Sequence, residues 1–417
     1  MKKISKVYPL IIALMFSCQA YQEPLSENNI SQVLNAEEKL GSFSVVKTVD
    51  KPKFWNKIEL IRSADTSIDP EIMLKRGRQR DQDIINTFGT DLPSSTDFCL
   101  HDMGAPTELK NKTPILLIHG ANTTATRSWV DPDGDAKKQG LAQYLKAKGF
   151  RVFAITFANK HGDNFVWSSH IGTAIERIKQ LTKVDKVDTI GHSKGGFSLR
   201  LHVSNVFEKQ NPFKQNIRKT MFIGTPHRGI DFSFRHPIIN WALIEDTDSP
   251  LTYAPLSWKK MLWKGQWVDS KDMYIGSGNF KGQLQILGRL DKVNSLSVLE
   301  QDWFTTYNGG DGVVSKSEGI DALMKQGGNL VAKVMKSPVD SSVKVYNLVG
   351  EKNNIPGILN EFTGKSDGLL FSYSAGAVQD LTGKGAVLVE NKVMNLNHLD
   401  LVSSPESMEW IAKSFAN

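Results

Sequence analysis

The sequence predicts an α/β fold in which helices cover both faces of a mostly parallel central sheet. From residue 113 onwards, apolar runs alternate with segments of helical periodicity. The runs are continuously apolar, as in strands buried on both faces of a sheet. A serine flanked by glycines, Ser193, follows one such run and precedes a helical segment. Because strands that alternate with helices form parallel sheets with right-handed crossovers, we expect a mostly parallel sheet.

The expected elements follow one another along the chain. Strands are predicted at residues 114–118, 151–157, 187–190, 219–223, 343–349 and 386–389, and helices at 140–148, 171–181, 197–203 and 406–415. Apolar residues at helical spacing, beginning at Ile171 and ending at Leu181, support the second of these helices. The alternation stops near Thr225 and resumes at Val343. This interruption predicts a large cap or lid insertion over about residues 228–340, which holds five of the nine tryptophans.

The chain divides into three parts by composition. Residues 1–20 have the pattern of a signal peptide, residues 21–110 form a polar N-terminal extension without a recognisable motif, and residues 111–417 form the main domain. The apolar stretch of the first part, residues 8–16, is too short to span a bilayer. Two outcomes are open: cleavage after Ala20, or lipidation of Cys18 as in bacterial lipoproteins. We therefore expect an outer-membrane lipoprotein, a periplasmic protein or a secreted protein.

Composition and charge limit the classes of binding partner that we expect for this protein. Hydrophobic residues make up 40% of the chain and charged residues 23%, which is typical of a soluble globular protein. The net charge is +7, but no dense stripe of lysine and arginine with interleaved aromatic residues is present, so we expect no nucleic-acid partner. The only cysteines are Cys18 and Cys99. If Cys18 is removed or lipidated, the mature protein has no disulfide and no thiolate metal site.

The strongest motif is the sequence Gly191-His192-Ser193-Lys194-Gly195-Gly196, which matches G-x-S-x-G between a strand and a helix. A serine on such a tight turn is pushed above the sheet, and side chains two residues away on either side would collide. The helix that follows points its positive end at the site. The motif therefore predicts that Ser193 is a nucleophile, which needs a base and an acid that orients the base.

The base and the acid are expected after Ser193 along the chain. Four histidines follow Ser193, and His398 is separated from the last strand by a loop. His202 lies on the helix that follows the nucleophile, His227 precedes any candidate acid, and His236 lies in the insertion. We therefore predict His398 as the base.

Two Asp-Gly pairs compete for the acid. Asp367 lies between the last two strands, and Asp311 lies inside the insertion. Position favours Asp367.

An oxyanion hole is expected where the first core strand ends, at His119-Gly120-Ala121-Asn122. The backbone N–H of Ala121, with Asn122 as the alternative, would act together with the N–H of Lys194. Two such donors would stabilise a tetrahedral oxyanion.

Taken together, five segments resemble the bacterial triacylglycerol lipase and esterase branch of the α/β-hydrolase superfamily. They are residues 114–120, 191–196, 224–229, 366–368 and 397–402, in the family's order. The resemblance implies an α/β-hydrolase fold, a catalytic triad of Ser193, Asp367 and His398, and oxyanion donors at Ala121 and Lys194. It also implies a carboxylic ester hydrolase that needs no cofactor. In related lipases an aspartate at the position of Asp400 helps to hold a structural calcium, but one carboxylate makes no calcium site.

The substrate depends on the insertion. The stretch of residues 257–267 mixes tryptophans with lysines, which indicates a lid over an apolar acyl pocket or a cap with its own small core. We expect acylglycerols or other esters as substrates, with contact to a lipid surface through the lid or through a lipidated Cys18. The alternatives are another acyl substrate, such as a polyester or a peptide, or a catalytically silent surface binding module.

Overall fold

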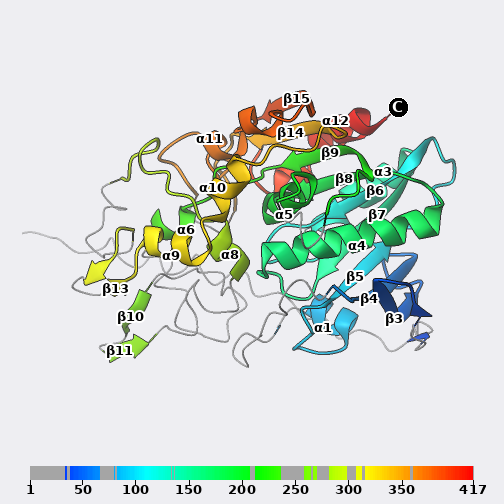
Figure 1. Ribbon diagram of the computed structural model, residues 1–417, viewed down its shortest axis with the longest axis horizontal. Coiled ribbons are helices and arrows are strands. Elements are labelled where there is room, and N and C mark those ends of the chain that lie inside the picture. Colours follow the sequence, from blue (N-terminus) through cyan, green and yellow to red (C-terminus); the bar gives the residue numbers. More distant parts are fainter. Residues whose placement is uncertain are drawn as a thin grey trace, which may run out of the picture.

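A computed structural model of the chain contains one large sheet and one small sheet (Figure 1). The structure describes residues 33–34, 38–65, 79, 82–132, 134–135, 137–206, 212–235, 258–263, 266–269, 281–297, 307–311, 315–356 and 360–416. The large sheet has the strand order β1-β3-β4-β5-β7-β6-β8-β9-β14-β15, with β2 paired to β3. Residues 1–20 and Cys18 lie outside the described residues.

The part of the large sheet from β7 to β15 is parallel. Its strands are β6 (Asn111–Ile118), β7 (Phe150–Phe157), β8 (Val187–His192), β9 (Ile217–Ile223), β14 (Lys344–Gly350) and β15 (Val387–Met394). All six expected strands are present. The chain passes from β6 to β7 on one side and then to β8 on the other, so the carboxyl end of β6 lies at a topological switch point, where sheets of this kind bind ligands.

Helices cover both faces of this parallel region. They are α2 (Ala125–Trp129), α3 (Leu141–Ala147), α4 (Asn164–Thr182), α5 (Ser193–Val203), α11 (Ser372–Ala375) and α12 (Pro405–Phe415), with short 3₁₀ helices η5 (Gln379–Leu381) and η6 (Asp400–Val402). One core cluster packs the apolar face of α4 against the sheet, and another packs α3 and α12 against the opposite face. The predicted mostly parallel sheet with helices on both faces is confirmed.

The segment that composition marked as an N-terminal extension contributes strands to the large sheet. These are β1 (Val33–Leu34), β2 (Glu38–Lys39), β3 (Phe43–Asp50), β4 (Lys57–Ser63) and β5 (Asp97–Asp102), with α1 (Gln82–Phe88) between β4 and β5. They are antiparallel, and β5 pairs with β7. A buried ion pair between Glu59 and Arg177, with both contacts at 2.8 Å, joins β4 to α4.

The insertion of about residues 228–340 contains several short elements. They are α6 (Phe232–Arg235), α8 (Lys281–Gln285), α9 (Ile320–Gln326), α10 (Leu330–Met335), and the small sheet of β10 (Trp258–Trp263), β11 (Gln266–Asp269), β12 (Gly310–Asp311) and β13 (Ser315–Ser317). In Figure 1 the small sheet lies to the left, away from the large sheet. None of the helices in the described part of the chain is both long and apolar enough to span a bilayer.

Candidate active site

Ser193 lies on a sharp turn between β8 and α5. Its backbone has a positive φ of 53°, a conformation that non-glycine residues rarely adopt and that is common at functional sites. The neighbouring glycines are required by close backbone contacts. A Cβ atom on Gly191 would lie 2.7 Å from the Cα of Gly196, and one on Gly195 would lie 2.1 Å from the carbonyl oxygen of His119. The turn therefore presents the Ser193 side chain directly beside the end of β6.

His398 and Asp367 lie in direct contact. His398 Nδ1 is 2.6 Å from Asp367 Oδ2, and the backbone N–H of His398 donates to the carbonyl oxygen of Asp367 at 2.8 Å. Both side chains are buried. The second carboxylate oxygen, Oδ1, accepts the N–H groups of Leu369 and Leu370 at 3.1 and 2.8 Å. An ionised carboxylate only accepts hydrogen bonds, so this contact places the proton of His398 on Nδ1 and leaves Nε2 as a base.

His192 joins this pair to the nucleophile turn. Its Nε2–H donates to the carbonyl oxygen of His398 at 3.1 Å, and the two rings lie 4.7 Å apart. Burial and the neighbouring His398 lower the pKa of His192 well below its usual range, so this ring is neutral at pH 7. From the other side, a Cβ atom on Gly224 would lie 3.2 Å from the His398 ring. The structure thus brings His398 and Asp367 beside the residue that precedes Ser193.

At the end of β6, His119 fixes the peptide group that carries the N–H of Ala121. His119 Nδ1 donates to the carbonyl oxygen of Gly120 at 2.7 Å, and Nε2 accepts the N–H of Phe157 at 3.3 Å. Burial lowers the pKa of His119 to about 3, so the ring stays neutral and keeps these roles. Because a trans peptide directs its C=O and N–H to opposite sides, holding the Gly120 carbonyl also orients the Ala121 N–H.

The two candidate oxyanion donors on this loop differ in what they bind. The N–H of Asn122 donates to the carbonyl oxygen of Lys160 at 3.1 Å, so it is already engaged. Within the described residues, the N–H of Ala121 has no hydrogen-bond acceptor. This difference favours Ala121. The N–H of Lys194 lies in the first turn of α5, at the positive end of that helix.

The side chain of Lys194 is buried beneath the insertion. Its Nζ lies 3.1 Å from the centre of the Trp167 ring. A Cβ atom on Gly282 of α8 would lie 2.3 Å from Lys194 Cε, so the backbone of α8 covers this side chain directly. Asn164 holds α8 in place, because its side chain donates to the carbonyl oxygen of Gly282 at 2.9 Å and its backbone N–H donates to Gln285 Oε1 at 2.8 Å. The sequence carried no signal for Asn164 or Gln285.

Of the other candidate bases, the two that the structure describes, His227 and His202, contact other residues than Asp367. His227 is fully buried, with Arg200 Nη1 3.0 Å from its Nδ1 and Asn347 Oδ1 3.2 Å from its Nε2. Burial and the positive charge of Arg200 lower the pKa of His227 well below its usual range. His202 packs against Phe213, and His236 lies outside the described residues.

Neither the rival acid nor the calcium position contributes to the contact at His398. Asp311 belongs to β12 of the small sheet, and Asp367 is the carboxylate that contacts His398. Asp400 Oδ2 accepts a hydrogen bond from Asn397 Nδ2 at 2.8 Å. The described part of the chain contains no group of three or more metal-binding histidine, cysteine, aspartate or glutamate side chains.

A family model described as an α/β hydrolase of unknown function matches residues 119–236, from the end of β6 to the end of α6. Together with the strand order and the turn at Ser193, this match decides the fold. The protein has the α/β-hydrolase fold. The superfamily resemblance drawn from the sequence is thereby confirmed, as is the expected fold class. No curated protein matches the chain significantly.

Several solved structures of lipases and esterases are similar to this one. A mature lipase from Bacillus licheniformis is 13% identical, with a TM-score of 0.44 over 76% of this chain and 98% of that chain. A thermostable carboxyl esterase from Bacillus coagulans is 13% identical, with a TM-score of 0.41 over 76% and 93% of the two chains. Naproxen esterase from Bacillus subtilis is 13% identical, with a TM-score of 0.36 over 77% and 88%. These values describe remote similarity in fold, and a shared fold does not determine function.

Proposed function

We propose that the protein is a serine hydrolase that cleaves carboxylic esters through an acyl-enzyme intermediate. The observation that carries this proposal is the 2.6 Å contact between His398 Nδ1 and Asp367 Oδ2, beside a serine held at a φ of 53°. A buried carboxylate that orients a histidine next to a strained serine is the arrangement that activates a serine hydroxyl.

In the proposed mechanism, Ser193 Oγ attacks the ester carbonyl carbon while His398 Nε2 takes the hydroxyl proton. Asp367 holds the ring in the required tautomer and stabilises the imidazolium that forms. The N–H groups of Ala121 and Lys194 bind the oxyanion, each contributing about 3 kcal/mol to stabilisation of the transition state. His398 then returns the proton to the leaving alcohol. Water, activated by the same histidine, hydrolyses the acyl-enzyme. No step requires a cofactor.

We propose acylglycerols as the substrate class, with the insertion as a cap over the acyl pocket. The insertion supports this proposal because it covers the nucleophile helix at α8 and carries most of the tryptophans. The names of the similar structures, which include a lipase and esterases, agree with it. A lipid-surface contact through the insertion, and through a lipidated Cys18 in the cell envelope, is part of the same proposal; a soluble secreted form is the alternative for localisation.

The test is covalent labelling of the purified protein with a fluorophosphonate, followed by assays on p-nitrophenyl esters of short and long acyl chains. We expect labelling and turnover in the wild type and neither in Ser193→Ala. A preference for long chains that increases at an emulsion interface would support a lipase, and a preference for soluble short esters would indicate an esterase. Inertness toward esters with intact labelling would point to another acyl substrate, such as a polyester or a peptide. A folded wild type that stays unlabelled even with detergent would overturn the enzyme and leave a surface binding module.

A further inference from the structure

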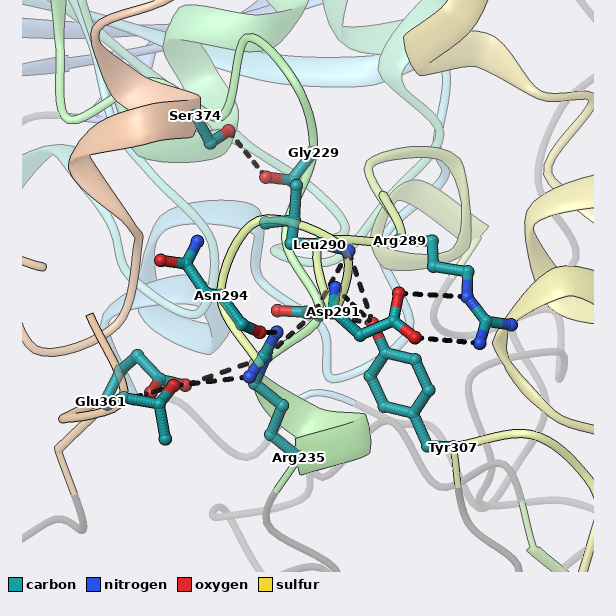
Figure 2. Close-up of polar contacts among 11 residues, drawn as sticks. Gly229, Arg235, Arg289, Leu290, Asp291, Asn294, Tyr307, Glu361 and Ser374 are labelled. Atoms are coloured by element: carbon teal, nitrogen blue, oxygen red, sulfur yellow. Dashed lines mark hydrogen bonds and ion pairs between the residues drawn. The ribbon is translucent and has the colours of Figure 1, made fainter. Parts of the chain in front are cut away.

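A buried ionic cluster joins the insertion to the segment that carries Asp367. Arg235, at the end of α6, lies between two carboxylates, Asp231 just before α6 and Glu361 in the segment after β14. The exposed fractions of the Arg235, Asp231 and Glu361 side chains are 0%, 1% and 1%. Figure 2 shows the Arg235 side chain extending between Glu361 and the segment of residues 289–294.

On the insertion side, Arg235 is fixed by several contacts. Its Nε lies 2.9 Å from Asp231 Oδ2, and its Nη2 donates to the carbonyl oxygen of Asn294 at 2.6 Å. Asp231 Oδ2 in turn accepts the hydroxyl of Tyr307 at 2.7 Å and the backbone N–H of Leu290 at 3.3 Å. The guanidinium is therefore held in one orientation by the insertion itself.

On the other side, Arg235 contacts the tight turn of residues 361–371, which we call the acid hairpin. Arg235 Nη1 donates to Thr363 Oγ1 at 3.3 Å, and the guanidinium carbon lies 4.8 Å from the centre of the Phe371 ring. Thr363 connects Arg235 to Glu361, because the hydroxyl and the backbone N–H of Thr363 both donate to Glu361 Oε1, at 2.5 and 2.9 Å. Arg235 thus touches both arms of the acid hairpin.

The hairpin places Asp367 at its tip. The N–H of Glu361 donates to the carbonyl oxygen of Gly368 at 2.8 Å, and Ser366 Oγ donates to the carbonyl oxygen of Glu361 at 2.5 Å. Ser366 also forms a β-bridge with Phe371. Asp367 therefore lies between Ser366 and Gly368, which are both hydrogen-bonded to Glu361. Arg235 contacts Glu361 and also Phe371, the bridge partner of Ser366.

We propose that Arg235 is a positioning residue, which holds the acid hairpin so that Asp367 keeps its contact with His398. This inference rests on the proposed function, because it assigns a role in the Ser193–His398–Asp367 triad. A buried arginine with two buried carboxylates contributes little net stability compared with apolar residues of the same volume. What it supplies is directional contact. The planar guanidinium donates to Asn294 and Thr363 in two fixed directions and forms an ion pair with Asp231, and lysine, as a point charge, does not reproduce this geometry.

The experiment compares Arg235→Met, Arg235→Lys and Glu361→Gln with the wild type, all as full chains. Circular dichroism and active-site titration with a fluorophosphonate give the folded and active fractions, and kcat and KM are measured separately for a soluble p-nitrophenyl ester. The matched control is Arg177→Met. Arg177 is also a largely buried arginine paired with a buried carboxylate, that of Glu59, and in the described residues it makes no contact with the acid hairpin.

If Arg235 positions Asp367, kcat per active site falls at least about tenfold in Arg235→Met, as expected for misplacement of a catalytic group. The loss appears in kcat and not in KM, because Asp367 acts through His398 on the transferred proton and not on ester binding. Arg235→Lys recovers only part of the rate. Glu361→Gln, which keeps the shape and the hydrogen bonds from Thr363, gives a smaller change in the same direction.

Two outcomes would overturn the inference. In one, activity falls only in proportion to the active fraction, so that kcat per active site is unchanged. In the other, Arg177→Met lowers kcat per active site as much as Arg235→Met does. If Arg235→Met does not fold, the inference is judged from the kcat values per active site of Glu361→Gln and Arg235→Lys. A wild type that neither labels nor turns over ester would instead refute the proposed function, so the two failures are distinct.

Discussion

Replacing Asp367 by asparagine tests the proposed triad with little disturbance of the fold. In the structure, Oδ1 of Asp367 accepts two backbone N–H groups, from Leu369 and Leu370, and Oδ2 faces His398 Nδ1. An asparagine keeps its oxygen at the first position, because turning the amide would set its NH₂ against two N–H donors. That reversal would cost about 1–3 kcal/mol for each unsatisfied group.

The NH₂ of the asparagine must therefore face His398. The histidine then accepts at Nδ1 and carries its proton on Nε2, the tautomer that is unable to take the proton of Ser193. For a triad of this kind, the wrong tautomer lowers kcat by about 10⁴-fold. Since the backbone hydrogen bonds remain, we expect the unfolding free energy to change by less than about 1.5 kcal/mol.

The assay is the initial rate of p-nitrophenyl ester hydrolysis and the rate of fluorophosphonate labelling, with Ser193→Ala as the background. The control is Asp311→Asn, which changes the rival Asp-Gly pair and should leave both rates near the wild-type values. A folded Asp367→Asn variant that keeps more than about a tenth of the wild-type kcat would refute the role of Asp367, because tautomer loss predicts a far larger effect. If Asp311→Asn alone abolished activity, the acid would be Asp311.

Three further predictions concern packing and pH. Gly195→Ala places a Cβ atom 2.1 Å from the carbonyl oxygen of His119, so the nucleophile turn must move away from β6; we expect about 1–3 kcal/mol of destabilisation and a large loss of ester turnover, and an unchanged melting temperature and rate would contradict the packing. Burial lowers the pKa values of His101 and His170 to about 3, so the unfolded chain binds these protons first as the pH falls. Denaturant titrations should therefore show about 2 kcal/mol of lost stability per histidine between pH 6.5 and 5, and a flat profile would count against buried neutral rings. Burial raises the pKa of Asp231 to about 6, so its protonation stabilises the folded state at pH 4 and this contribution is lost as the pH rises through 6. Relative to Asp231→Asn, the wild type should lose about 2 kcal/mol of unfolding free energy between pH 4 and 7, and equal profiles for the two proteins would show that Asp231 titrates normally.

The parallel strands were predictable because their sequences are apolar without interruption. The expected strands at 114–118 and 151–157 fall within β6 and β7, and the expected helix at 171–181 is the second half of α4. The first turns of α4 combine buried apolar with buried polar residues, and Asn164 there donates to the carbonyl oxygen of Gly282 in α8, so the apolar spacing is not regular. The helix starts where it does because Asp163 accepts the N–H of Phe165.

The antiparallel strands were not predictable in the same way. β4 alternates apolar and charged residues, and its Glu59 is buried only because Arg177 of α4 pairs with it. The last strand was expected at 386–389, but β15 continues to Met394 through polar residues that an edge strand tolerates.

For the site, motif order singled out Ser193, Asp367 and His398, whereas the roles of His119 and Arg235 depend on contacts between distant segments. No local sequence pattern predicts those contacts.

The sheet order has a consequence for how the chain folds. β3, β4 and β5 are made first, yet they attach to the sheet only through β7, about fifty residues further along the chain than β5. Until β7 is available, the apolar faces of these strands have no partner layer, and their free edges can pair with other chains. During synthesis they need protection by a chaperone or by rapid completion of the chain. Truncation of the first 110 residues would, in turn, leave β7 as an exposed apolar edge, and we expect the truncated protein to aggregate.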